Sequence, residues 1–142
     1  MNPDLDEFKA LGIDYGEKRI GIALSELNGK FAVPHSILQY KNIEFALNEI
    51  KKISNENNIS LIVIGLPITL KNELGFKAKE VMKFKTSLQK LVTTDIVLED
   101  ERLSTAQAIR AISPKSKRKY VDDSSATIIL NSFLRKRSNS DE

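Results

Sequence analysis

Alternating apolar and polar residues predict three strands near the start of the chain. Ala10–Asp14 forms a short strand pattern, and large aliphatic residues take every second position of Arg19–Ser25. The short connection between these segments indicates a hairpin. Asn28-Gly29 is a strong turn signal before a third strand over 30–38, and Pro34 places that strand near a sheet edge.

Helical and strand patterns alternate along the rest of the chain. Apolar residues at helical spacing predict helices from Ile43 to about Asn57, around Val81–Leu91 and around Ala126–Leu134. Leu61–Ile64 and Ile96–Leu98 are continuous aliphatic runs, which are typical of strands buried on both faces. Ser104-Thr105-Ala106-Gln107 matches a capping box and predicts a further helix that Pro114 ends.

This order of elements predicts an α/β fold with one central, mixed, five-stranded sheet. A three-stranded antiparallel meander comes first, two parallel strands follow, and about four helices flank the sheet. The length of 142 residues is ordinary for one domain. We expect that domain over residues 1–136 and a polar C-terminal tail over 137–142.

The composition excludes several classes of protein. With 41% hydrophobic and 29% charged residues, the chain resembles a soluble globular protein. It has no apolar run of about eighteen residues, so we expect no membrane partner. The acidic N-terminal segment lacks the apolar core of a secretory signal, and the absence of cysteine excludes disulfides and thiolate chemistry. We therefore expect a cytoplasmic protein.

The net charge of +3 is modest, but the positive charge is clustered. The clusters comprise Lys77, Lys79, Lys83 and Lys85, then Lys115–Lys119, then Arg135–Arg137. Such clusters suit a phosphate backbone. Solvated helix faces and a soluble tail are the alternative interpretation.

Carboxylates stand at two strand ends and at the start of the last helix. Asp14 closes the first strand, Glu99-Asp100-Glu101 closes the last strand, and Asp122-Asp123 opens the final helix. Functional groups collect outside the carboxyl ends of parallel strands, so these carboxylates can converge. A divalent cation removes the repulsion between them, and oxygen ligands suit Mg²⁺ or Mn²⁺. Two such ions about 4 Å apart can drive phosphodiester hydrolysis.

Each carboxylate also has a purely structural interpretation. Asp122 is a good helix N-cap, and Glu99–Glu101 can be a solvated loop. Lys18 or Arg19 can pair with Asp14 without a metal. Around Asp14, however, small residues leave room for a phosphate: they are Gly12, Gly16, Gly21, Ala23 and Ser25.

Residues 11–23, Leu-Gly-Ile-Asp-Tyr-Gly-Glu-Lys-Arg-Ile-Gly-Ile-Ala, resemble the opening signature of the YqgF family, also called RuvX. The resemblance continues in order through Val63–Pro67, Asp100–Thr105 and Val121-Asp122, and so spans almost the whole chain. One block departs from the family pattern. After Gly-Leu-Pro the family usually has Leu-Asn-Met-Asp-Gly, whereas residues 68–72 here are Ile-Thr-Leu-Lys-Asn, which puts substrate contacts from that loop in doubt.

The resemblance implies a ribonuclease H-like fold and a nuclease that matures the 5′ end of pre-16S ribosomal RNA. It implies a catalytic set of Asp14, the pair Asp100 and Glu101, and Asp122, without a choice within the pair. The implied ligands of Mg²⁺ or Mn²⁺ are Asp14, Glu101 and Asp122. The residues implied to bind substrate are Gly16, Lys18, Arg19, Arg102, Ser104 and Thr105.

Two other functions remain as alternatives for the same residues. A Holliday-junction resolvase is the first, and a non-catalytic nucleic-acid-binding module, whose acidic set would be broken, is the second. Actin-like ATPases and sugar kinases have a similar hairpin but need a second domain, for which 142 residues leave no room. The expected partner is nucleic acid, with pre-ribosomal RNA ahead of branched DNA, and the oligomeric state, monomer or weak dimer, stays open.

Overall fold

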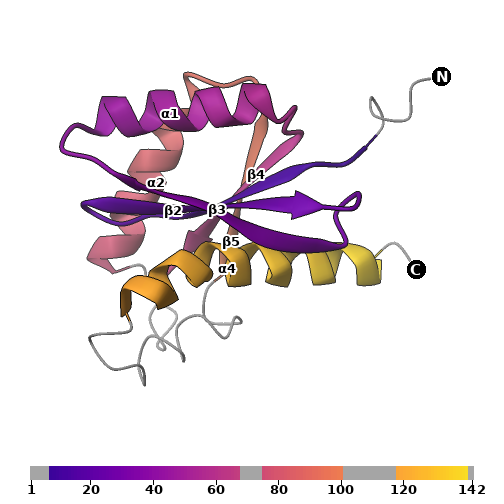
Figure 1. Cartoon of the computed structure of the whole chain (residues 1–142). Coiled ribbons are helices and arrows are strands. Elements are labelled where there is room, and N and C mark those ends of the chain that lie inside the picture. The colour runs from indigo at the N-terminus through magenta and orange to yellow at the C-terminus, as the bar shows by residue number, and fades with distance from the viewer. Residues whose placement is uncertain (1–6, 68–74, 101–117, 141–142) are drawn as a thin grey trace.

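The computed structural model describes residues 7–67, 75–100 and 118–140, with the side chains of 118–124 and 140 outside the description. Five strands and three helices lie in this part of the chain (Figure 1). In chain order they are β1 (Ala10–Asp14), β2 (Arg19–Glu26), β3 (Phe31–Gln39), α1 (Ile43–Glu56), β4 (Leu61–Leu66), α2 (Phe76–Gln89), β5 (Asp95–Asp100) and α4 (Arg118–Ser140).

The strands form one sheet in the order β3-β2-β1-β4-β5. β2 is antiparallel to both β1 and β3, whereas β1, β4 and β5 run parallel. This confirms the mixed sheet of a meander and two parallel strands. It also places β3 at an edge, as Pro34 indicated. Ile22 pairs with Ser36 and Ala23 with Pro34, so His35 is the extra residue of a bulge beside the proline.

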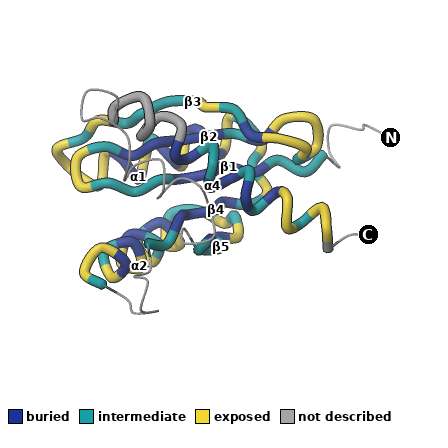
Figure 2. Tube along the Cα trace, turned by 90° about the horizontal axis from the view of Figure 1, so that it is seen from below, coloured by how far each residue is buried: buried dark blue, intermediate teal, exposed yellow. Residues whose placement is uncertain are grey.

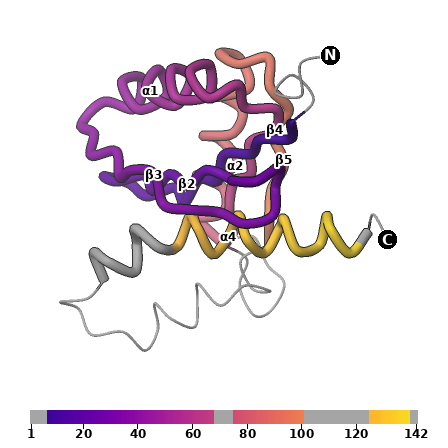
Figure 3. The backbone as a smooth tube through the Cα atoms, turned by 45° about the vertical axis from the view of Figure 1, so that its right-hand side comes forward, coloured from indigo at the N-terminus to yellow at the C-terminus, as the bar shows by residue number. Residues whose placement is uncertain are grey.

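Helices cover both faces of the sheet. α1 and α2 lie on one face and α4 lies on the other (Figures 1 and 3). Alternate strand residues therefore belong to two cores. Ile13 and Ile64 pack with α1 and α2, whereas Ala10 and Val63 pack with Ile129 and its neighbours on α4. Burial is continuous along the middle strands (Figure 2).

Local signals account for the ends of α1. The Asn42 side chain accepts a hydrogen bond of 2.8 Å from the Glu44 N–H and so caps the first turn. The helix ends before Asn57, and Asn58 adopts a positive φ of 53°. Asparagine tolerates that conformation better than most residues. The asparagine pair therefore ends the helix where the sequence predicted.

Two expectations about helices need correction. The part of the chain that the structure describes contains three helices rather than about four, and the one expected from Ser104 lies outside it. α4 begins at Arg118, so Asp122 lies within the helix and the N-cap interpretation is wrong. Arg118 and Lys119 are good helix formers, which explains the earlier start.

α4 also continues to Ser140, past the residue at which we expected a tail to begin. The guanidinium carbon of Arg137 lies 3.7 Å from the centre of the Phe8 ring, so the end of the helix packs on the start of the chain. The domain boundary at residue 136 itself stays a prediction. Among the described helices, none has the length and apolar character that a membrane crossing requires.

Candidate functional site

Asp14 stands at the carboxyl end of β1, half-buried, on the sheet face that α4 covers. Gly12 identifies this face, because a Cβ built on it would lie 2.8 Å from Leu130 Cβ and 3.0 Å from the Ala126 carbonyl oxygen. Side chains two residues apart in a strand share a face, so Asp14 points to the same side as Gly12. The missing side chain of Gly12 thus lets α4 pack directly on the strand that carries Asp14.

Residues without side chains flank Asp14 on both neighbouring strands. Gly21 of β2 is its antiparallel partner. On the other side Ile13 pairs with Ile64, so Gly65 comes beside Asp14, and Gly65 in turn pairs with Glu99 of β5. Strands lie about 4.8 Å apart, which puts the Cα atoms of Asp14 and Glu99 about 10 Å apart. Asp14 and Glu99 therefore lie on either side of Gly65, which places no side chain between the two carboxylates.

Glu99 is the most buried carboxylate among the described residues, at 4% exposure. Lys136 Nζ lies 2.9 Å from Oε1 and 2.8 Å from Oε2, and the Ser132 hydroxyl donates to Oε2 at 2.8 Å. Both partners belong to α4. From the sequence alone, Glu99 is one of the carboxylates that close the last strand, with a solvated loop as the alternative, and it was not included in the predicted site. The one signal was strand alternation, since Glu99 stands two residues after Val97 and therefore on the same face of β5.

Asp100 lies on the other face of the sheet. Ile96 and Leu98 pack in the core under α1 and α2, and Asp100 follows them at the same alternation. Its strand partner Leu66 packs against that core as well. The structure therefore does not bring Asp100 to the face of Asp14.

Asp122 lies one helical turn before Ala126, whose carbonyl oxygen is packed against Gly12. α4 runs antiparallel to β1, because Ala126 lies at Gly12 whereas Arg137 lies at Phe8. Four helical residues rise about 6 Å, and two strand residues from Gly12 to Asp14 rise about 6.6 Å. The backbone of Asp122 therefore comes to the level of Asp14.

The turn between β1 and β2 forms one wall of an open groove of about 770 Å³, which we call the hairpin groove. Glu17, Lys18, Arg19, Gln39, Tyr40 and Lys41 line it. The groove thus contains two of the residues that were expected to bind substrate. Its three cations against one carboxylate suit an anionic ligand.

Tyr40 and Gly16 hold the shape of this turn. The Tyr40 hydroxyl donates a hydrogen bond of 2.6 Å to the Gly16 carbonyl oxygen. A Cβ on Gly16 would collide with the carbonyl oxygen of Arg19. Burial, then the hydrogen bond and charge of Tyr15, raises the pKa of Tyr40 far above its usual value, so the phenol stays protonated and continues to donate.

The other predicted site residues lie outside the described part of the chain. They are Glu101, Arg102, Ser104 and Thr105, together with the atypical loop over 68–72. Within the described residues there is no group of three or more acidic or histidine side chains that could hold a metal. Glu101 and the side chain of Asp122 lie outside the described part of the chain, so the metal site of Asp14, Glu101 and Asp122 stays a prediction.

Comparisons with known proteins agree with the fold. The model of the RuvX family, described as "Holliday junction resolvase", matches residues 8–136. Thermus thermophilus RuvC superposes with a TM-score of 0.60 at 11% identity, over 93% of this chain and 97% of RuvC. At such low identity this likeness shows the fold alone, and it fits the expected ribonuclease H-like architecture.

Curated relatives are similar over nearly their whole length. A Desulforudis audaxviator protein named "Putative pre-16S rRNA nuclease" is 34% identical over 134 residues, which cover 91% of this chain and 95% of the relative. A Syntrophomonas wolfei protein of the same name is 36% identical over 131 residues, with 89% and 93% covered. By both the family match and these relatives, the chain belongs to the RuvX family.

Proposed function

We propose that this protein is a metal-dependent nuclease that hydrolyses phosphodiester bonds at the 5′ end of pre-16S ribosomal RNA in the cytoplasm. The observation that carries the proposal is the setting of Asp14. It is a half-buried carboxylate at the carboxyl end of a central parallel strand, with Gly21 and Gly65 beside it. The names of the relatives supply the substrate.

In this proposal Asp14, Glu101 and Asp122 hold Mg²⁺ or Mn²⁺. The donors fit these ions, since all are carboxylate oxygens. The ions supply an activated water and charge stabilisation for the leaving oxygen. The position of Asp100 on the opposite face supports Glu101 as the ligand within the adjacent pair.

The chain's own residues bind and orient the RNA. Lys18, Arg19 and Lys41 of the hairpin groove attract the phosphates next to the cleaved bond. Gly16 permits close approach of a phosphate at the turn, and Tyr40 keeps the turn in place through its hydrogen bond. Arg102, Ser104 and Thr105 are proposed as further substrate contacts. Orientation of the phosphate between these cations and Asp14 favours in-line attack.

Holliday-junction resolution is the second candidate, because the description of the matching family names that activity. The two candidates differ in symmetry. A resolvase cuts two strands of a junction symmetrically and needs two active sites, whereas an RNA-trimming nuclease needs one. Comparison of the two substrates with one enzyme preparation, with the oligomeric state measured alongside, separates the candidates.

The test is cleavage of an RNA that spans the 5′ end of 16S ribosomal RNA, beside a four-way DNA junction, with Mg²⁺ or Mn²⁺ and with a chelator. We expect Asp14→Asn to abolish cleavage while the protein still unfolds in one cooperative transition in urea. Asp95→Asn, an exposed carboxylate at the other end of β5, is the matched control and retains activity. Cleavage by Asp14→Asn at the normal rate removes Asp14 from the mechanism, and metal-independent cleavage overturns the metal.

A further inference from the structure

A second basic groove lies far from Asp14, between the C-terminal half of α4 and the turn that joins β2 and β3. We call it the rear groove. It has a volume of about 460 Å³, and its lining includes Lys30, Arg135, Arg137, Asn28, Asn131 and Ser138. The lining holds three cations and no acid, and the Glu7 carboxylate beside it accepts a hydrogen bond of 3.3 Å from the Asn28 N–H. Amide and hydroxyl side chains supply further donors, which is the mixture that contacts phosphates in nucleic-acid complexes.

The walls of the rear groove are fixed before any ligand binds. Leu27, Asn28 and Gly29 have positive φ angles of 51°, 57° and 86°, and the N–H groups of Gly29 and Lys30 both bond to the Glu26 carbonyl oxygen at 3.2 and 3.1 Å. A Cβ on Gly29 would lie 2.8 Å from the Phe8 ring. The turn is therefore set by its own hydrogen bonds and by close contact with the chain's start.

The cations on α4 are held in a similar way. The guanidinium of Arg137 stacks 3.7 Å from the Phe8 ring centre, and the Ala32 N–H donates a hydrogen bond of 2.8 Å to Asn131 Oδ1. The second bond ties α4 to β3 next to the groove. Because Arg137 is already ordered by its stacking, it loses little side-chain entropy when a phosphate binds.

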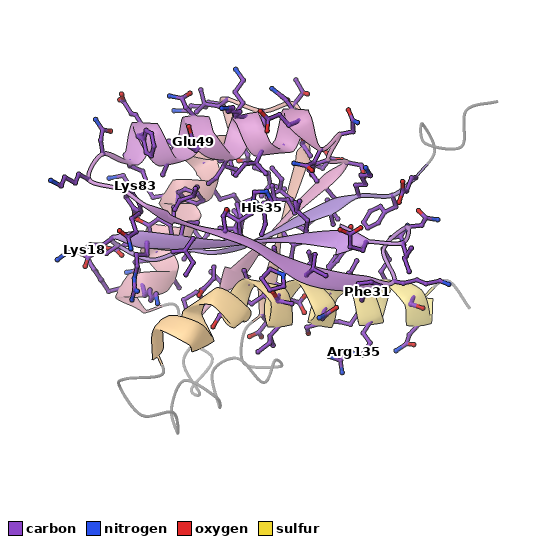
Figure 4. All side chains as sticks on the ribbon, in the orientation of Figure 1. Lys18, Phe31, His35, Glu49, Lys83 and Arg135 are labelled. Atoms are coloured by element: carbon purple, nitrogen blue, oxygen red, sulfur yellow. The ribbon has the colours of Figure 1, made fainter. Side chains whose placement is uncertain are left out.

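The rear groove and the hairpin groove lie at opposite ends of the sheet. Figure 4 shows Lys18 at one end of the molecule, with Phe31 and Arg135 toward the other. Gly21 pairs with Asp14, and the β2–β3 turn at Asn28 comes seven residues later. At about 3.3 Å per strand residue, this separation is roughly 23 Å. A duplex advances about 3 Å per base pair, less in A-form RNA than in B-form DNA, so the span equals roughly seven base pairs.

We propose that the rear groove binds the phosphate backbone of the substrate nucleic acid about seven base pairs away from the cleaved bond. The proposal rests on the proposed nuclease function. It adds a second phosphate contact on the duplex, at a fixed distance from the cleaved bond. Charge complementarity favours this occupant, since the groove offers three cations to a polymer that carries a charge on every nucleotide.

The test compares two RNAs that share one cleavage site and differ only in duplex length. The short RNA has arms of about four base pairs, and the long RNA has arms of about twelve. The groove variant is Lys30→Gln with Arg135→Gln, two exposed positions. The matched control is Lys51→Gln with Lys52→Gln on the exposed side of α1, which changes net charge equally on the other layer of the fold. Dissociation constants are measured without divalent metal over a range of salt concentrations.

We expect the groove variant to bind the long RNA more weakly. The slope of log Kd against log salt concentration should fall by about 1.4 to 1.8, because two phosphate contacts are lost. The affinity of the groove variant for the short RNA stays equal to that of the wild type, and the control variant behaves as the wild type on both RNAs. Equal losses in groove and control variants, or equal losses on both RNAs, overturn the proposal. Unchanged affinity for both RNAs also overturns it and leaves an acidic protein as the candidate ligand.

Cleavage by the wild-type protein is measured separately on the same RNAs. A chain that fails to cleave but retains the length-dependent loss supports the groove and overturns the nuclease function. If the wild type cleaves the RNA but the groove variant shows no length-dependent loss of affinity, the nuclease function is supported and the groove proposal is overturned. Equal urea midpoints for the wild type and both variants confirm that the comparison concerns binding rather than folding.

Discussion

The ion pair between Glu99 and Lys136 offers the most direct check on the packing of α4 against the sheet. The Glu99 side chain is 5% exposed and the Lys136 side chain is 51% exposed. Removal of one partner from a fully buried pair costs about 3–5 kcal/mol, whereas exposed pairs contribute about 0.2–1 kcal/mol. Since only Glu99 is buried, we expect Lys136→Met to lower the free energy of unfolding by about 2 kcal/mol, between these limits.

The cost arises because Lys136→Met removes the cation from a buried carboxylate, which keeps the hydrogen bond from the Ser132 hydroxyl. Glu99→Gln removes the charge, so the double variant should be little worse than Glu99→Gln alone. Urea denaturation of the wild type, both single variants and the double variant gives the coupling energy. With a slope of about 2 kcal/mol per molar urea, the loss in Lys136→Met appears as a midpoint shift of about 1 M.

Lys83→Met is the matched control, because Lys83 is an exposed lysine on α2, and methionine and lysine have similar helix propensities. We expect its midpoint to stay within error of the wild type. The reasoning is refuted if the two single losses add in the double variant to within about 0.5 kcal/mol, since contacting charges that stabilise one another must couple.

Three further substitutions test the geometry around Asp14. Gly12→Ala should lower the free energy of unfolding by about 1–3 kcal/mol and reduce cleavage, because the helix backbone must retreat; unchanged urea midpoints contradict this. Gly16→Ala should reduce cleavage of RNA by displacing the carbonyl of Arg19 from its place in the turn, and normal rates contradict it. Tyr40→Phe should lower the free energy of unfolding by about 1 kcal/mol at neutral pH, as measured by urea denaturation, because the hydrogen bond to the Gly16 carbonyl is lost.

The raised pKa of Tyr40 also has a consequence at alkaline pH. Its stabilising contribution is fully present below the unfolded pKa of about 10 and is lost as the pH rises above that value. The wild type should therefore lose stability above pH 10 more steeply than Tyr40→Phe. If the free energies of unfolding of the two proteins fall in parallel above pH 10, this prediction is wrong.

Local pattern was enough to predict the sheet. Leu61–Leu66 is aliphatic on both faces because helices cover both sides, whereas β2 alternates large residues with small ones. The position of Asp14 at a strand end followed from the same pattern. Glycine near Asp14 was visible too, although only the structure shows that Gly12 lies against α4 rather than against a ligand.

The site depends on contacts that no local pattern records. Glu99 meets Lys136 across 37 positions of the chain, and Asn131 meets Ala32 across 99. Helix length was likewise undetermined, because the stacking of Arg137 on Phe8 stabilises the last turns of α4.

The sequence by itself determined which residues alternate, and therefore that Glu99 and Asp100 point to opposite sides of β5. It did not determine which side belongs to Asp14. That assignment requires the strand order, with β4 between β1 and β5, and the placement of α4 on one face with α1 and α2 on the other. The physical reason is that periodicity is a property of a few neighbouring residues, whereas the choice of a sheet face is made by helices that pack from far along the chain.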